Sequence, residues 1–161
     1  MKLDELYDRY GEQMYRYLAL RLGSVEDARD VLQETFCRLA RCAVRRSIVR
    51  NPGAFAFRVL RNEANRHLRK IVDRRAGDVA ARERSATEAS LFTGRDENTA
   101  HLVSTALAGL PDDQREAVIL KVYQDFSFKE IGRMCGVSIN TAASRYRYGI
   151  EKMRASLGDG S

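Results

Sequence analysis

One stretch of the chain, residues 127–154, has the pattern of two short helices joined by a tight turn. It reads SFKEIGRMCGVSINTAASRYRYGIEKMR. Ser127 can cap the first helix, and Glu130, three residues later, completes a capping box. Gly136 can adopt the left-handed conformation that a sharp turn between helices requires, and Ser138 can cap the second helix. The stretch therefore predicts a helix-turn-helix motif.

The second of these helices sorts its side chains onto two faces, because residues at three- and four-residue steps share a side of a helix. The inward set is Ile139, Ala142, Tyr146, Ile150, Met153 and Leu157. The outward set is Thr141, Ser144, Arg145, Tyr148 and Lys152. Hydroxyl and guanidinium groups can reach phosphates and base edges, so the outward set suits the DNA major groove. The alternative is an amphipathic helix of an ordinary bundle, whose polar face contacts only water.

The composition favours an all-α fold. The chain has 161 residues, of which 44% are apolar and two are proline, and no segment shows sustained strand-like alternation. No apolar run approaches the roughly 20 residues of a membrane span, and the N-terminus lacks the apolar core of a signal peptide. We therefore expect no membrane insertion. The net charge of +6 favours a polyanionic partner.

The positive charge is concentrated in one block of the chain. Residues 4–37 hold four Arg or Lys and eight acidic residues, a net charge of −4. Residues 38–75 hold twelve Arg or Lys and two acidic residues, a net charge of +10. Because this basic block is separate from the helix-turn-helix, the chain is expected to have two nucleic-acid surfaces, with an acidic surface before the first.

Three helices are predicted before residue 75. The first spans residues 3–22 and ends at Gly23, and the second follows the capping residue Ser24 and reaches about residue 40. Asn51 and Pro52 mark the start of the third, which reaches about residue 72. Its surface arc carries Arg58, Arg61, Asn62, Asn65, Arg66 and Arg69, and the loop before it carries Arg45, Arg46 and Arg50. A solvated helix usually mixes charge signs, so this arc favours contact with phosphates.

A change of composition divides the chain into two domains. Residues 74–97 are rich in Ala, Arg, Ser, Thr, Gly and Glu with few apolar anchors, which predicts a flexible linker. Beyond it, Leu110 and Pro111 separate two helices that precede the helix-turn-helix. We predict a domain of three to four helices at residues 1–75, a linker at 76–97 and a four-helix domain at 98–161.

No pattern in the sequence indicates catalysis. The three cysteines, Cys37, Cys42 and Cys135, form no CxxC motif, and His67 and His101 lack metal-ligand spacing. No nucleophile–base pair and no pair of catalytic carboxylates is recognisable. We therefore expect no enzymatic activity, no metal and no cofactor.

Three segments carry a resemblance to a known family. They are LYDRYGEQMYRYLALRLGSVEDARDVLQETFCRLAR, NPGAFAFRVLRNEANRHLRK and ALAGLPDDQREAVILKVYQDFSFKEIGRMCGVSINTAASRYRYGIEKMR. In combination and order they resemble a bacterial sigma factor of the sigma-70 family, and the small two-domain extracytoplasmic-function (ECF) group fits best. The resemblance covers nearly the whole chain apart from the linker and the extreme tail.

The resemblance implies a promoter-specificity subunit that directs core RNA polymerase to a restricted set of promoters. Its first domain, sigma region 2, would bind the clamp helices of the polymerase β′ subunit and would recognise and melt the minus-ten element. The implied polymerase contacts are Asp27, Asp30, Gln33, Glu34 and Arg38. The implied minus-ten contacts are the arc of the third helix and the three arginines of the loop before it.

The second domain, sigma region 4, would read the minus-thirty-five element and contact the polymerase β flap. The implied DNA contacts are Asn140, Thr141, Ser144, Arg145, Arg147 and Tyr148. The implied partners are core RNA polymerase, promoter DNA in duplex and single-stranded form, and an anti-sigma factor. The implied location is the bacterial cytoplasm.

Two other functions compete with this one. A stand-alone helix-turn-helix regulator would bind duplex DNA without polymerase, but it leaves the basic block of residues 38–75 without a role. A helical adaptor that binds only proteins leaves the one-sided basic arc unexplained.

Overall fold

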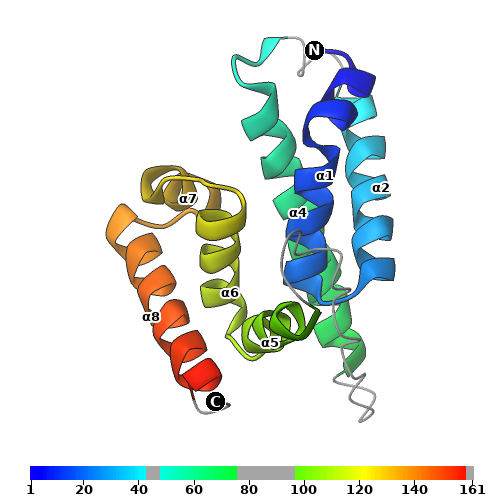
Figure 1. Ribbon diagram of the computed structural model, residues 1–161. Helices are drawn as coiled ribbons and strands as arrows, with labels where there is room; N and C mark the ends of the chain where they lie inside the picture. The colour runs from blue at the N-terminus through cyan, green and yellow to red at the C-terminus, as the bar shows by residue number, and fades with distance from the viewer. Residues whose placement is uncertain (43–47, 76–96, 159–161) are drawn as a thin grey trace. The chain divides into compact units, whose positions relative to one another are not determined.

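The computed structural model describes residues 1–42, 48–75 and 97–158, which form helices joined by turns, without a strand (Figure 1). The chain divides into two compact units, Met1–Ser85 and Ala86–Ser161. The all-α fold expected from the sequence is confirmed. The linker predicted at residues 76–97 lies outside the described residues except for Glu97, and so do Arg45 and Arg46.

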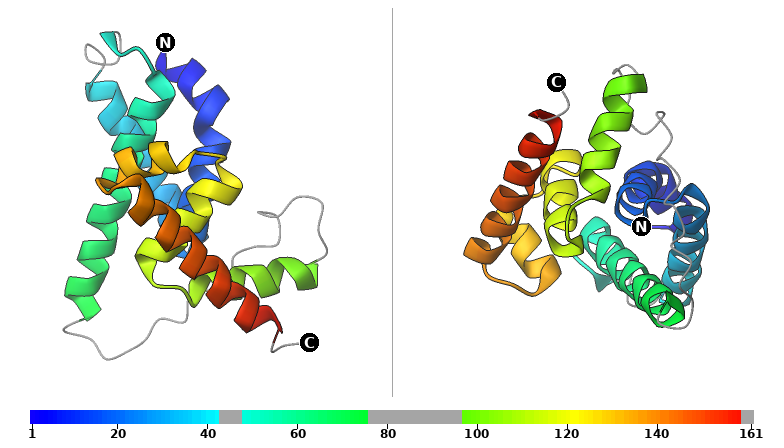
Figure 2. Two further views of the ribbon diagram at one scale, coloured as in Figure 1. Left: turned by 90° about the vertical axis from the view of Figure 1, so that its left-hand side faces the viewer. Right: turned by 90° about the horizontal axis from the view of Figure 1, so that it is seen from below.

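The first unit is a bundle of three helices: α1 (Leu3–Leu22), α2 (Val25–Arg41) and α4 (Pro52–Arg75). Each packs against the other two (Figures 1 and 2). Their shared core consists of apolar side chains, including Leu6, Met14, Leu18, Leu39 and Leu60. Full burial of one such side chain contributes about 1.5–3 kcal/mol, so this core holds the three helices together.

Local hydrogen bonds set the helix ends of this unit. Gly23 ends α1 in the left-handed conformation, with φ of 70°. At the start of α2, Ser24 Oγ accepts a hydrogen bond of 3.2 Å from the Asp27 amide. At the start of α4, Asn51 Oδ1 accepts one of 3.1 Å from the Ala54 amide. All three ends lie where the sequence predicts them, and α4 continues slightly beyond its predicted end.

The second unit contains α5 (Glu97–Ala108), α6 (Asp112–Val118), α7 (Phe128–Cys135) and α8 (Ile139–Gly158). The last of these packs against each of the other three. A π-helical segment, η2 (Ile119–Tyr123), continues directly from α6. Its wider turn is closed by a hydrogen bond of 3.3 Å from the Gln124 amide to the Ile119 carbonyl. The helix predicted here is therefore present, but its last turn is π-helical.

A buried arginine joins α6 to the end of α5. Arg115 is 4% exposed, and its Nε donates a hydrogen bond of 2.9 Å to the Leu107 carbonyl. Its Nη2 donates to the carbonyls of Ala108 and Leu110 at 3.0 and 2.8 Å. The last carbonyls of a helix have no partner within the helix, so this side chain satisfies the end of α5 and fixes the corner between the two helices.

The buried face of α8 differs in part from the predicted one. Ala142 and Met153 are buried as expected, but Ile139 is 52% exposed and Leu157 is 36% exposed. Both lie at the ends of α8, where neighbouring helices give less cover. Gly149 is buried between them, because α6 approaches α8 closely at this residue.

This close approach predicts a cost for a larger residue at position 149. A Cβ there would lie 2.8 Å from Val118 Cγ2, and Val118 is itself 2% exposed and has little room to move. Gly149→Ala should lower the free energy of unfolding by about 1–3 kcal/mol relative to Gly158→Ala. A Cβ at Gly158 has no neighbour within 4 Å. Urea unfolding followed by circular dichroism measures the difference, and equal stability of the two variants would contradict the packing.

Candidate protein and nucleic-acid interfaces

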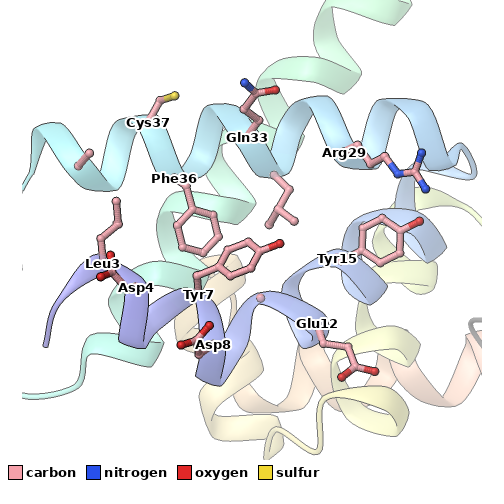
Figure 3. Close-up of a pocket in the computed structure, with 13 residues that line it drawn as sticks. Leu3, Asp4, Tyr7, Asp8, Glu12, Tyr15, Arg29, Gln33, Phe36 and Cys37 are labelled. Atoms are coloured by element: carbon pink, nitrogen blue, oxygen red, sulfur yellow. The ribbon is translucent and has the colours of Figure 1, made fainter.

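A groove of about 1140 Å³ runs between α1 and α2 (Figure 3). Its lining is partly aromatic, since Tyr7 and Phe36 meet edge to face with ring centroids 5.2 Å apart. Leu3 and Leu32 extend the apolar surface. Tyr7 is 56% exposed, so this surface is accessible to a partner protein.

The two rims of the groove carry different polar groups. The α1 rim is acidic, with Asp4, Asp8 and Glu12, whereas the α2 rim carries Arg29 and Gln33 (Figure 3). A partner helix that turns apolar residues into the groove and basic residues toward α1 would match both features.

The sequence-based prediction does not include this groove, although the sequence carries a signal for it. Leu3, Tyr7, Gly11 and Tyr15 recur at four-residue steps, and all four line the groove. This second stripe on α1 lies beside the core stripe and contains two tyrosines, which suit a surface that is partly apolar and partly wet.

The polymerase contacts predicted on α2 divide between two sides of the helix. Gln33 lines the groove with α1, whereas Asp30 and Glu34 line a smaller pocket of about 220 Å³ against α4. All three side chains are exposed. They therefore remain available to a protein partner.

The other two predicted contacts, Asp27 and Arg38, face α4. Asp27 Oδ2 lies 3.4 Å from His67 Nε2, and Arg38 forms an ion pair with Glu63. The Glu63 carboxylate is 5% exposed and also lies 3.7 Å from Arg66 Nη1. Removing the cationic partner of a buried carboxylate strongly destabilises a folded protein. Arg38 is such a partner for Glu63, so it stabilises the contact between α2 and α4.

On α4, four of the predicted minus-ten contacts form an exposed strip, called the basic ridge below. They are Arg58, Asn62, Arg66 and Arg69, at three- and four-residue steps. Arg50 is exposed just before the helix, Arg61 is half-buried, and Arg45 and Arg46 lie outside the described residues. The ridge contains no acidic side chain, as predicted from the sequence.

Asn65 is directed toward the core rather than toward the ridge. Its Oδ1 accepts a hydrogen bond of 2.7 Å from Nη2 of Arg21, a residue of α1 that is 2% exposed. Nη1 of the same arginine donates to the Tyr17 hydroxyl at 2.9 Å. The side-chain oxygen of Asn65 thus satisfies a buried cation and joins α4 to α1.

The helix-turn-helix has the local hydrogen bonds that the sequence predicts. At the start of α7, Ser127 Oγ accepts a hydrogen bond of 3.2 Å from the Glu130 amide, and Glu130 Oε1 accepts one of 3.4 Å from the Ser127 amide. Gly136 ends α7 with φ of 70°. Ser138 Oγ then caps α8 by accepting a hydrogen bond of 3.0 Å from the Thr141 amide.

The predicted minus-thirty-five contacts lie on the N-terminal half of α8, and the surface that they occupy is called the recognition face below. Asn140, Thr141, Arg147 and Tyr148 are exposed, and Ser144 and Arg145 are half-buried. Arg147 stacks on the Tyr148 ring, 5.7 Å from its centroid. Arg145 contacts Asp113 at the start of α6, an ion pair that the sequence analysis does not predict.

Comparison with known proteins gives matches over both units. Sigma-70 region 2 matches residues 6–75, and Sigma-70, region 4 matches residues 100–153. RNA polymerase sigma factor CarQ of Myxococcus xanthus is 32% identical over 97% of this chain and 89% of its own length. ECF RNA polymerase sigma factor EcfG of Rhodopseudomonas palustris is 32% identical over 84% of this chain and 74% of its own length.

A solved structure has the same fold. The sigma factor RpoE from Bartonella quintana, crystallised in complex with the anti-sigma factor NepR, superposes with a TM-score of 0.78. The match covers 91% of this chain and 90% of that chain, at 24% sequence identity.

The chain therefore belongs to the sigma-70 family of RNA polymerase sigma factors, in the group named for extracytoplasmic function. It is a promoter-specificity subunit that acts with core RNA polymerase and promoter DNA in transcription initiation. A stand-alone regulator or a protein-only adaptor does not account for the region 2 match in the first unit. None of the helices in the described part of the chain is long and apolar enough to cross a membrane.

The contact between Arg21 and Asn65 predicts unequal roles for two asparagines of α4. Asn65→Ala removes an acceptor from a buried guanidinium and should lower the free energy of unfolding by about 1–3 kcal/mol. Asn62→Ala makes the same chemical change at an exposed position and should stay within about 0.5 kcal/mol of wild type. Urea unfolding of the full chain compares them. If both variants were equally stable, Asn65 would have no structural role.

Proposed function

We propose that three surfaces of this chain have separate roles in promoter-directed initiation of transcription. The α1–α2 groove and the adjoining face of α2 bind the β′ clamp helices of core RNA polymerase. The basic ridge of α4 binds the minus-ten element as it melts, and the recognition face of α8 reads the minus-thirty-five element in the duplex. The observation that carries the proposal is the charge of the first unit, which combines an acid-rimmed apolar groove with an acid-free basic ridge.

The groove suits helices better than DNA. Its acidic α1 rim, with Asp4, Asp8 and Glu12, repels phosphates, whereas the exposed Tyr7 and the half-buried Phe36 offer apolar and aromatic contact area. Gln33 lies on the other rim and can give the interface a hydrogen bond. These features together support a helical protein partner that carries basic and apolar residues.

The polymerase assignment predicts the behaviour of a double variant of α2. Gln33→Ala with Glu34→Ala should weaken binding to core polymerase about tenfold, as expected for the loss of a hot spot at an interface. Both side chains are exposed, so the free energy of unfolding should change little. The control is Glu151→Ala, which removes one exposed acid from α8. Co-elution at graded concentrations gives the affinities, and wild-type binding by the double variant would refute the assignment.

The basic ridge suits a single strand that has left the duplex. Arg58 and Arg69 lie at the two ends of the ridge and can each bind a backbone phosphate of the strand. Asn62 lies between them and can both donate a hydrogen bond to an unstacked base and accept one from it. Arg50 extends the positive surface before the helix. Asn65 accepts a hydrogen bond from the buried Arg21 of α1. In this proposal it is a positioning residue, because that bond fixes which face of α4 is turned outward.

The ridge assignment predicts a defect in DNA melting. Arg58→Ala with Arg69→Ala should reduce open-complex formation more than polymerase binding. The salt dependence of DNA binding should also become shallower, by about 0.7 in the log–log slope for each lost contact with a single strand.

The control is Lys70→Ala, which removes a positive charge from the side of α4 that faces α2. Permanganate reactivity of promoter thymines, measured with the promoter half-saturated by holoenzyme, reports melting. The assignment fails if the double variant melts DNA as well as Lys70→Ala does.

The proposal gives the chain no chemistry of its own. Recognition and strand capture need only donors, acceptors and charges, which the three surfaces supply, and nucleotide addition belongs to the polymerase core. We infer that the chain acts where that core is, in the bacterial cytoplasm, and that an anti-sigma factor would inhibit it by covering the groove.

A further inference from the structure

An acidic residue of α6 contacts the arginine at the centre of the recognition face. Asp113 Oδ2 lies 3.6 Å from Nε of Arg145. The other carboxylate oxygen, Oδ1, accepts a hydrogen bond of 2.9 Å from the Gln114 amide. Both oxygens of Asp113 are thus engaged, one with its own helix and one with α8. α6 packs against α8 (Figure 2), and the ion pair joins one residue of each helix.

The contact engages one particular atom of the guanidinium. Nε is the inner nitrogen, and the two outer nitrogens, Nη1 and Nη2, form the fork that bonds to O6 and N7 of guanine in the major groove. A carboxylate on Nε therefore orients the fork without occupying it. The Arg145 side chain is 29% exposed, so it is partly covered by the protein but still reaches solvent.

We propose that Asp113 is a specificity-determining positioning residue for the minus-thirty-five element. It holds the Arg145 guanidinium so that both outer nitrogens meet a guanine edge together. The inference rests on the proposed function, in which α8 enters the major groove. It adds a residue outside the helix-turn-helix to the set that decides which promoters are read.

The ion pair between Asp113 and Arg145 should increase selectivity among bases more than overall affinity for DNA. A long arginine side chain that is ordered before binding loses less conformational entropy when it forms the bidentate contact. The same carboxylate repels DNA phosphates, which penalises every arrangement in which Arg145 contacts the backbone instead of a base. Ion pairs this exposed add little to folding stability, so the stability of the fold does not require Asp113 at this position.

The test measures base preference with the holoenzyme. Core RNA polymerase carrying the full chain is mixed with a pool of promoter duplexes whose upstream element is randomised, and the bound fraction is sequenced. Wild type should prefer guanine at one position, and Arg145→Ala should abolish that preference. Asp113→Asn should reduce the same preference about two- to fivefold, as expected for an ion pair this exposed, and leave the other positions unchanged.

Two further variants test whether Asp113 acts by positioning Arg145 rather than through its negative charge alone, and an unfolding measurement tests for an effect on stability. Asp112→Asn removes a neighbouring exposed acid and should raise overall affinity without changing base preference at any position. In the Arg145→Ala background, Asp113→Asn should have no further effect on base preference. Thermal unfolding should give similar midpoints for the two Asp→Asn variants.

Two results would overturn the inference in distinguishable ways. If Arg145→Ala leaves every base preference intact, then the role of Arg145 in the proposed function fails, and the role of Asp113 fails with it. If Arg145→Ala abolishes the guanine preference but Asp113→Asn leaves it at the wild-type level, then the proposed function stands and Asp113 does not position Arg145.

Discussion

A buried arginine fixes the helix arrangement in each unit. Arg21 of α1 is 2% exposed and bonds to Asn65 of α4, and Arg115 of α6 is 4% exposed and bonds to the last carbonyls of α5, those of Leu107 and Ala108. A buried cation that loses its acceptors costs far more than a surface ion pair, so neither helix pair can rotate or slide without a large penalty. Both proposed DNA surfaces depend on these contacts. The first sets the face that α4 turns outward, and the second anchors α6, where Asp113 meets α8.

The parts of the fold that sequence analysis predicts are those set by neighbours along the chain. The caps at Ser24, Asn51 and Ser127 depend on amides three residues away, and Gly23 and Gly136 act on their own backbone. These local hydrogen bonds and backbone conformations do not depend on contacts with distant residues, so the helix starts lie where the sequence predicts them. The exposed ridge of α4 is also predictable, because its charge repeats at the period of a helix.

The remaining features depend on contacts between distant residues. Arg21 and Asn65 are 44 positions apart, so periodicity alone assigns Asn65 to the DNA-binding arc although its oxygen faces the core. Asp113 and Arg145 meet only because α6 packs on α8 across the close contact at Gly149. The groove needs α1 and α2 side by side, and the π-helical turn of η2 has no recognisable sequence pattern. In each case tertiary packing supplies information that local propensity lacks.

The central claim is that this one chain binds core RNA polymerase and two separate promoter elements at the same time. The most direct measurement maps the 5′ ends of transcripts that core RNA polymerase makes from genomic fragments in vitro, with and without the chain. The account predicts start sites that appear only with the chain and that share two sequence blocks upstream, one near minus ten and one near minus thirty-five. It would be contradicted if the chain produced no new start sites, or produced start sites that share only one block.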